Sequence, residues 1–393
     1  MYVLITVLFI MAGLKKTNAQ SDGNQNAIIA AVPFLKIVPD ARSSAMGDVG
    51  IAIDPDANTM FYNASNLVFA EYDFGLSLTY TSWLRALGLD DIFLGYLSTY
   101  KKIDDKQALG FGLRYFSVGR LQYTDDQGNS LQSVKPYELA LDMAYARKLG
   151  KTLSLGLTLR YIMSNLGTGT TAGGATLKPA HAFATDLSLS YNKTLRIAKR
   201  RSVFRAGIAL TNLGTKVSYV SSGAQEYLPA NMGVGTSLKV EIDNRNSISF
   251  AADINKLLVP TPISSYIEDE SGNTITNPAY DTNADGIADY KQQSMPLAVI
   301  SSFGDAPGGV IEEINELMFS FGIEYWYNKQ FAVRCGYYYE HQDKGNRQFF
   351  SVGVGVKYKI FNFNFSYLIP TRKAQVSPLD NTLRFSLMFN FGK

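Results

Sequence analysis

The stretch Ser351–Pro370, SVGVGVKYKIFNFNFSYLIP, decides the fold class of this chain. Its first half places apolar or aromatic residues at even-numbered positions, and its second half places aromatic residues at odd-numbered positions. Such alternation indicates β-strands whose two faces meet different surroundings. A two-residue loop at Lys359 and Ile360 explains the change of phase, because it makes Tyr358 and Phe361 cross-strand neighbours on one face. The pattern predicts a hairpin, although Lys-Ile is not a favoured turn pair.

The same alternation recurs along most of the chain, in segments of roughly ten residues. That is the length a tilted strand needs to cross a bilayer. Together with the two strands of the opening hairpin, the pattern predicts fourteen strands, at 72–82, 91–101, 107–118, 136–147, 152–164, 182–192, 202–213, 231–241, 246–257, 317–327, 331–341, 348–358, 361–368 and 381–391.

The composition narrows the class of protein further. Aromatic residues make up 12% of the 393 residues, charged residues 18%, and the mean hydropathy is -0.04. A helical membrane protein would be more apolar, and no internal run of eighteen apolar residues occurs. The net charge of +3 gives no indication of nucleic-acid binding. One cysteine excludes an intramolecular disulfide framework, and two histidines leave little material for histidine-based catalysis.

The connections between the predicted strands alternate in length. Short ones lie at 102–106, 148–151, 193–201, 242–245, 328–330 and 359–360, and longer ones lie between them. Outer-membrane barrels have short periplasmic turns and longer external loops, and we expect both chain ends on the periplasmic side. A soluble β-sandwich would share the alternation but has no reason for this bias in loop length. We therefore predict an all-β fold, an antiparallel transmembrane β-barrel.

The first twenty residues predict a signal peptide. Met1–Gln20 holds about a dozen apolar residues followed by a polar segment that ends near Ala19. This length suits a signal peptide and is too short to span a bilayer. A buried first strand is the alternative. Cleavage near Ala19 or Gln20 would leave an exported chain.

Two segments are predicted to lie outside the barrel wall. Residues 21–71 lack a strand pattern and are too polar to face lipid, so we expect them to fold into the lumen as a hatch. The barrel then spans 72–393, with a long extracellular insertion at 258–316. Within that insertion, Asp305–Leu317 predicts a short helix whose apolar face is formed by Val310, Ile311, Ile314 and Leu317. The helix could cap the barrel mouth or dock a partner.

Charged residues occur on the predicted inward face of the strands. Charges of both signs can pair across a narrow wet interior, and we favour salt-bridge networks over a substrate path. The single cysteine, Cys335, lies on the lipid-facing phase and is interpreted as a small apolar filler. The inward charges are Arg114, Glu138, Asp142, Arg160, Asp186, Arg205, Asp253, Glu324, Arg334 and Arg384.

One segment of the insertion resembles half of a calcium-binding loop. In DTNADGIAD, oxygen-bearing side chains stand at alternate positions and a glycine allows a sharp turn. The twelfth position is glutamine instead of the usual bidentate glutamate, so a surface turn without an ion is the alternative. The predicted Ca²⁺ ligands are Asp281, Asn283, Asp285, Asp289 and the carbonyl of Ile287.

Several motifs resemble the PorV family of outer-membrane proteins from the Bacteroidetes type IX secretion system. They are PFLKIVPDAR, AMGD, PDAN and NAS within Pro33–Ser65, SSFGDAPGG at 301–309, EYWYNKQFAVRCGYYYE at 324–340 and NTLRFSLMFNFG at 381–392. That family is similar to the FadL transporters of hydrophobic compounds, which are fourteen-stranded barrels with an N-terminal hatch. FadL-like chains carry Asn-Pro-Ala where this chain has Asn63-Ala64-Ser65.

The resemblance implies a non-enzymatic outer-membrane component of secretion. Its expected partners are a SprA-like translocon, a PorU-like sortase or attachment complex, cargo C-terminal signal domains, and outer-membrane lipid and lipopolysaccharide. Cargo would be received from the translocon and delivered for surface attachment. A FadL-like transporter of fatty acids or other hydrophobic compounds is the main alternative. An enzyme acting on lipopolysaccharide acyl chains is a third, although no catalytic spacing of His, Ser and Asp is present.

Overall fold

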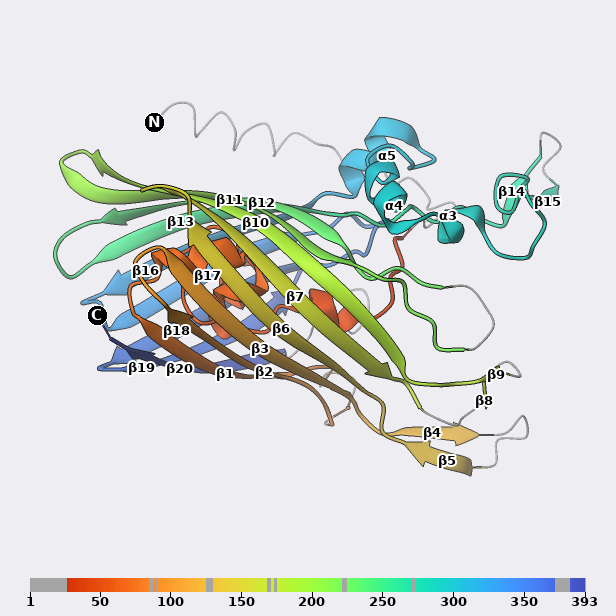
Figure 1. The fold of residues 1–393 in the computed structure, drawn as a ribbon, viewed down its shortest axis with the longest axis horizontal. Helices are drawn as coiled ribbons and strands as arrows, with labels where there is room; N and C mark the ends of the chain where they lie inside the picture. Colours follow the sequence, from red (N-terminus) through yellow and green to blue (C-terminus); the bar gives the residue numbers. More distant parts are fainter. Residues whose placement is uncertain are drawn as a thin grey trace.

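A computed structural model describes residues 27–84, 88–89, 91–124, 130–167, 171–172, 175–220, 225–269, 273–371 and 382–392. The predicted signal peptide Met1–Gln20 lies outside these residues. Fourteen antiparallel strands close into a barrel, which confirms the predicted fold class (Figure 1). They are β1 (Phe74–Ser82), β2 (Ile92–Lys102), β3 (Gln107–Val118), β6 (Tyr137–Lys148), β7 (Leu153–Asn165), β10 (Ala180–Ile197), β11 (Arg200–Gly214), β12 (Asn231–Glu241), β13 (Ser247–Leu257), β16 (Met318–Tyr327), β17 (Phe331–Tyr339), β18 (Gln348–Tyr358), β19 (Phe361–Pro370) and β20 (Leu383–Phe391).

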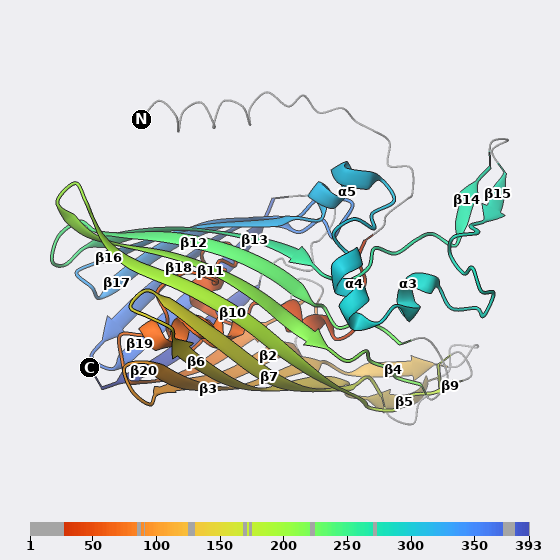
Figure 2. The same ribbon diagram turned by 45° about the horizontal axis from the view of Figure 1, so that its top comes forward.

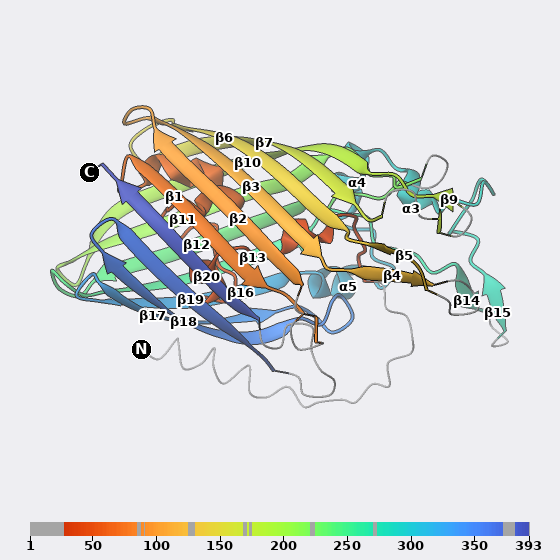
Figure 3. The same cartoon turned by 90° about the horizontal axis from the view of Figure 1, so that it is seen from below.

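Strand pairing follows the chain order, and the first and last strands complete the circle. Figure 3 shows β20 beside β1, where Leu78 pairs with Leu387. The hairpin predicted from the opening stretch is confirmed, since Tyr358 pairs with Phe361 across the turn. Lys359 takes a left-handed φ of 53°, which the first central residue of a tight hairpin turn requires.

The predicted nine-residue connection at 193–201 is wrong. The two strands continue through most of it, so that only Ala198 and Lys199 remain in the turn. Both residues have positive φ, at 50° and 67°, as a two-residue turn between twisted strands requires. The segment is rich in charged residues and lacks the apolar alternation of a strand, so the sequence pattern predicts a loop there.

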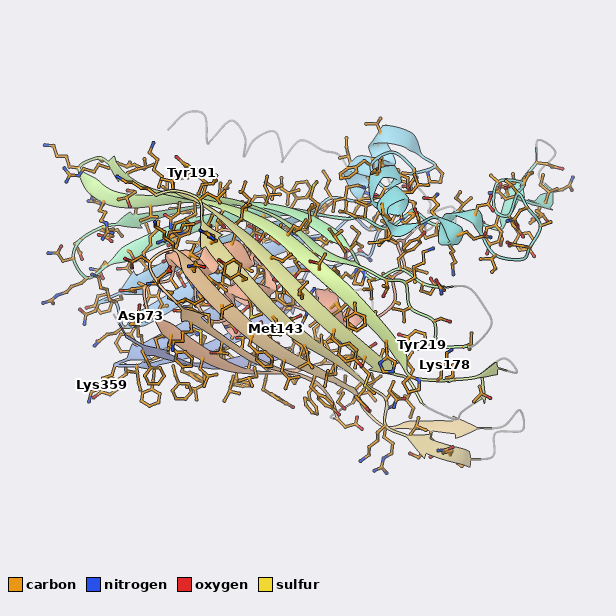
Figure 4. All side chains as sticks on the ribbon, in the orientation of Figure 1. Asp73, Met143, Lys178, Tyr191, Tyr219 and Lys359 are labelled. Atoms are coloured by element: carbon orange, nitrogen blue, oxygen red, sulfur yellow. The ribbon has the colours of Figure 1, made fainter. Side chains whose placement is uncertain are left out.

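The two faces of each strand differ as the alternation predicts. In β7, Leu155, Leu157 and Leu159 point outward and are exposed, whereas Ser154 and Thr158 point inward and are buried. Figure 4 shows outward side chains over the whole wall, with Met143 near its middle. An apolar band on the outside of a closed barrel is suited to hydrocarbon, because no backbone edge is left unpaired there.

Four short helices fill the lumen and form the hatch. They are η1 (Pro33–Lys36), α2 (Ala41–Ser44), η2 (Thr59–Phe61) and η3 (Ala64–Phe69), drawn in orange-red inside the barrel in Figure 1. Asp40 caps α2, accepting a hydrogen bond of 2.9 Å from the Ser43 amide. The hatch backbone at Met46 and Gly47 lies directly against Gly336 of β17, where any larger side chain would collide with it.

The first described residues lie at the extracellular opening, while the N-terminus itself, expected on the periplasmic side, lies outside the described residues. The Ala31 amide donates a 2.8 Å hydrogen bond to the Tyr227 carbonyl in an external loop. Ile28 and Ala30 pack against Tyr227 and Ala298, also on that side. The chain therefore enters the lumen from outside, passes through as the hatch, and leaves at the periplasmic end as β1.

The remaining elements extend from the extracellular end, as Figure 2 shows. They are the small hairpins β4–β5 (Leu121–Thr124, Ser130–Val134), β8–β9 (Thr171–Ala172, Ala175–Thr176) and β14–β15 (Tyr266–Glu268, Thr274–Thr276), and the helices α3 (Asp289–Gln292), α4 (Met295–Ser301) and α5 (Gly309–Asn315). The helix predicted at 305–317 is thus shorter, and α3 and α4 were not predicted. Among the described helices, none has the length and apolarity to cross a membrane.

Candidate functional site at the extracellular insertion and the adjoining wall

Buried ion pairs connect the hatch to the barrel wall. Glu324 of β16 accepts hydrogen bonds from Arg42 of the hatch at 2.9 and 3.0 Å and from Arg334 of β17 at 2.7 Å. All three side chains are buried. Arg42 also contacts Asp56 at 3.0 Å within the hatch. Two guanidinium groups therefore share one buried carboxylate, which fixes the hatch to the wall.

A second chain of charges runs across neighbouring strands. Arg114 pairs with Asp142 at 3.1 Å, and Arg160 contacts Asp142 at 2.5 Å and Asp186 at 2.8 Å. Arg160 also donates to the side chain of Asn212. All ten inward charges that the sequence singled out are buried. Most of them are paired, which supports the predicted salt-bridge networks over a path for apolar substrates.

The extracellular insertion is braced onto the barrel rim by charge pairs. Lys344, in the loop after β17, contacts Glu312 at 2.5 Å and Glu316 at 3.0 Å. Lys256 of β13 contacts Glu313 at 2.9 Å and also pairs with Glu316. The three glutamates belong to or directly follow α5, so that one face of this helix is held against the rim. Its other face is left for external contacts.

That other face carries apolar residues. Figures 1 and 3 place α4 and α5 at the extracellular end, and Figure 3 shows them apart, on different sides of the opening. Val310 and Ile311 are each 75% exposed, although the sequence assigned both to the apolar face of a helix. The helix therefore presents this face to solvent and does not use it to cap the mouth. We call the exposed set the insertion patch: Leu297, Ile300, Phe303, Val310, Ile311 and Ile314.

Below the insertion, the outer wall contains a groove of about 750 Å³. It crosses β11 to β18, and the insertion leaves and re-enters the barrel through two strands of this groove, β13 and β16. Aromatic side chains such as Phe250, Phe321 and Phe350 line it, with Ala252 and Cys335 between them. Cys335 is exposed on this lipid-facing surface, as the alternation predicts. We call this depression the wall groove.

The predicted calcium ligands lie together in one exposed turn of the insertion. Asp281 accepts hydrogen bonds from the amides of Asp285 and Gly286, at 3.2 and 2.7 Å. Asn283 and Asp285 contact each other at 3.0 Å, and Gln292 donates to Asp285 and to the Ile287 carbonyl. Asp289 instead accepts from Thr282, at 2.5 Å.

These contacts fold the segment around Gly286, whose φ is 85°. Within the part of the chain that the structure describes, no group of three or more His, Cys, Asp or Glu side chains is arranged to hold a metal ion. Calcium binding at this turn remains a prediction.

The two histidines lie on the extracellular side, far apart in the chain. His181 contacts the Tyr161 hydroxyl at 2.7 Å on the outer surface, and His341 lies 3.4 Å from Asp343 in the loop after β17. Neither histidine has a serine or cysteine side chain hydrogen-bonded to it among the described residues. The surroundings of the two rings give no positive indication of catalysis.

The sequence comparison identifies the family. The profile described as "Type IX secretion system protein PorV" matches residues 20–264, which include the hatch and the first nine of the fourteen barrel strands. The chain belongs to the PorV family. Members of this family are outer-membrane components of the type IX secretion system. The closed barrel with its apolar exterior agrees with an integral outer-membrane location. PorV proteins serve secretion, which agrees indirectly with the prediction that this chain is not an enzyme.

Two structures of TodX support the same fold at low sequence identity. The P. putida toluene transporter TodX is 13% identical, with 90% of this chain and 99% of TodX covered and a TM-score of 0.52. A TodX mutant titled a monoaromatic hydrocarbon channel is 14% identical, with the same coverage and TM-score. A Pseudomonas aeruginosa FadL homologue is 10% identical, covering 90% and 99%, with a TM-score of 0.44. No curated protein sequence matches the chain.

The PorV assignment and the FadL-like barrel confirm the resemblance seen in the sequence. Sequence reasoning identified three members of the insertion patch, because Val310, Ile311 and Ile314 alternate with glutamates at helical spacing. It missed Leu297 and Ile300 of α4, because the seven residues of this helix are too few to show a helical periodicity. The wall groove was also missed, since a depression depends on side chains from six strands.

Proposed function

We propose that this PorV-family protein is a cargo shuttle at the outer membrane. It binds cargo through the C-terminal signal domain, receives it from a SprA-like translocon, and delivers it to a PorU-like attachment complex. In this proposal residues 21–71 act as the hatch, 72–393 as the barrel, and 258–316 as the cargo-facing insertion. The observation that carries the proposal is the insertion patch on a braced external platform.

The insertion patch has the properties of a protein-docking surface. Its apolar side chains are exposed, and three of them, Val310, Ile311 and Ile314, stand together on α5, the helix that the charge pairs of Lys256 and Lys344 hold. Exposed apolar clusters rimmed by polar residues typically mark interaction sites. A rigid platform loses less conformational entropy on binding than a mobile loop does.

The lumen supports a route for cargo that does not pass through this barrel. Buried ion pairs such as Arg42–Glu324 fix the hatch inside it. Cargo would therefore be held on the external surface, and the wall groove would contact outer-membrane lipid, lipopolysaccharide or the neighbouring translocon. The alternative, uptake of hydrophobic compounds, is suggested by the fold shared with toluene transporters. The hatch and the buried charges inside the lumen are unfavourable for the passage of an apolar compound.

Deletion of the gene tests the shuttle. Proteins with C-terminal signal domains should accumulate in the periplasm, and complementation should restore their surface display. Unchanged surface display would contradict the proposal. If hydrocarbon or fatty-acid uptake falls instead, the transporter alternative is supported.

A matched pair of variants tests the insertion patch itself. Ile311→Ser with Ile314→Ser should abolish co-purification of cargo with the protein. Ile267→Ser with Ile275→Ser changes two equally apolar side chains in the β14–β15 hairpin of the same insertion, each 40% exposed. This control should retain cargo, and equal loss in both double variants would exclude a specific role for the patch.

A further inference from the structure

The β10–β11 hairpin extends beyond the barrel wall at the periplasmic end. Pairing of β10 with β7 ends at Tyr191, and pairing of β11 with β12 ends at Ser202. Outside the hairpin itself, residues 193–200 therefore have no neighbouring strand, and only Arg201 reaches β12, with a 3.5 Å ion pair to Glu241. The segment projects by about 15 Å along the strand direction. Figures 1 and 2 show this hairpin at the end of the barrel where the C-terminus lies.

The projecting segment is strongly basic. Residues 193–201 contain five cationic side chains and no carboxylate. Arg196 stands directly opposite Arg201 in the strand register. Like charges at facing positions are destabilising, so the fold alone gives no reason to keep this pair. By contrast, residues 258–316 on the extracellular side contain ten carboxylates and one cation.

The alternation of the strands assigns each cation to a face. Val203 and Arg205 line the lumen at the periplasmic mouth, so Arg201, two residues before Val203, shares their inward face. Arg196 pairs with Arg201 and lies on the same face. Lys193 pairs with Phe204 and Arg200 with Ile197, and these belong to the outward, lipid-facing phase.

The inward face leads into a cavity at the periplasmic mouth, which we call the vestibule. It has a volume of about 650 Å³ and is lined by six cationic side chains and four carboxylates. Arg205 and Lys239 share the single carboxylate of Asp54, at 2.5 and 2.6 Å. Lys329 and Lys357 form no ion pair with a carboxylate of the described residues. The vestibule therefore carries uncompensated positive charge.

Polar atoms in the vestibule also lack partners. Within the described residues, Arg205 Nε and Asn362 Oδ1 are buried without a hydrogen bond. Trp326 and Tyr72 line the same cavity, and the Lys357 ammonium lies 5.0 Å from the Tyr72 ring centre. A donor, an acceptor, aromatic faces and excess cations together form a surface suited to a peptide with acidic side chains.

We infer that the hairpin and vestibule bind an extended acidic segment of a periplasmic protein. The segment would pass along Arg196 and Arg201 and end in the vestibule beside Lys239 and Lys357. Anionic lipid headgroups are a poorer fit, because they lie outside the wall and would face Lys193 and Arg200 instead. This site is separate from the extracellular surface of the proposed shuttle function.

The test uses the full-length protein in detergent micelles and a fluorescein-labelled octaglutamate peptide. Fluorescence anisotropy should show saturable binding that weakens as salt is added. Arg196→Gln with Arg201→Gln should weaken binding by about 10-fold, whereas Lys193→Gln with Arg200→Gln, which removes the same charge from the outward face, should weaken it by less than about 2-fold. Arg196→Lys with Arg201→Lys keeps the charge and should retain most of the binding.

Equal weakening by the inward and outward pairs would overturn the inference, since it would indicate attraction to the overall charge. Absence of saturable binding to the wild-type protein would overturn it as well. A third result would also contradict the inference. In it, the inward variant binds the peptide as the wild type does, and only the outward variant loses retention of the protein on phosphatidylglycerol vesicles. That result would assign the hairpin to lipid binding. If the double Gln variant fails to fold, Arg196→Gln alone compared with Lys193→Gln alone makes the same comparison of inward and outward faces.

Discussion

Replacing Glu324 with alanine removes the carboxylate that two buried guanidinium groups share. Glu324 accepts from Arg42 at 2.9 and 3.0 Å and from Arg334 at 2.7 Å. Removing one partner of a buried ion pair costs about 3–5 kcal/mol. Arg42 keeps Asp56 at 3.0 Å and Arg334 keeps Asn364 at 2.9 Å, so we expect the lower end of this range. A loss of about 3 kcal/mol corresponds to a change of more than 100-fold in the unfolding equilibrium.

Urea unfolding in lipid vesicles, followed by tryptophan fluorescence, measures this loss. The Arg334 guanidinium lies 5.5 Å from the Trp326 ring centre, so one of the two tryptophans reports on the network directly. Hydrogen–deuterium exchange in hatch residues 41–56 should also rise. Glu241→Ala is the matched control, because Arg201–Glu241 is a 3.5 Å pair whose arginine side chain is 65% exposed. Such a pair contributes about 1 kcal/mol or less.

Two results would refute this reasoning. One is a loss of stability for the Glu324 variant no larger than that of the Glu241 control. The other is an unchanged exchange rate in the hatch, which would mean that the ion pairs do not hold it in the barrel.

Three further predictions concern single positions. Gly336→Ala should displace the hatch and lower the urea midpoint, because its Cβ would meet the hatch backbone, whereas Gly150→Ala, with open space around it, should not; equal midpoints would contradict the contact. Burial raises the pKa of Asp48 from 3.8 to about 6, so its contribution to stability falls as pH rises through that interval. Asp48→Asn should therefore flatten the dependence of the urea midpoint on pH, and an unchanged slope would contradict this. Calorimetric titration with CaCl₂ should give a binding heat that Asp281→Asn with Asp285→Asn abolishes, and absence of heat in the wild type would remove the calcium prediction.

The barrel could be predicted from sequence because its information is local. Alternation within each strand specifies which side chains face outward, and the 358–361 turn follows from one change of phase. Strand ends rich in charge carry no such signal, so the sequence predicts a connection at 193–201, where the strands in fact continue. Charged side chains tolerate water on either side of a strand, so composition there does not distinguish strand from turn.

Contacts between distant segments could not be predicted in the same way. The pattern marked Glu324 as inward, but nothing in the sequence indicates that its partner is Arg42, 282 residues away. The course of the hatch was equally hidden, because Ala31 is held by Tyr227 through backbone groups that every residue carries. At the insertion, helical spacing predicted the apolar residues of α5, and only the tertiary structure shows that Lys256 and Lys344 turn them toward solvent.

The account depends most directly on hydrocarbon surrounding the outward-facing side chains, and Cys335 allows that to be measured without mutagenesis. It is the single cysteine of the chain and is exposed on the outer wall in the middle of β17. A nitroxide attached there in reconstituted vesicles should collide frequently with dissolved oxygen and rarely with a water-soluble nickel chelate. Frequent collision with the chelate would show that water covers this face, and it would contradict the barrel's place in the membrane.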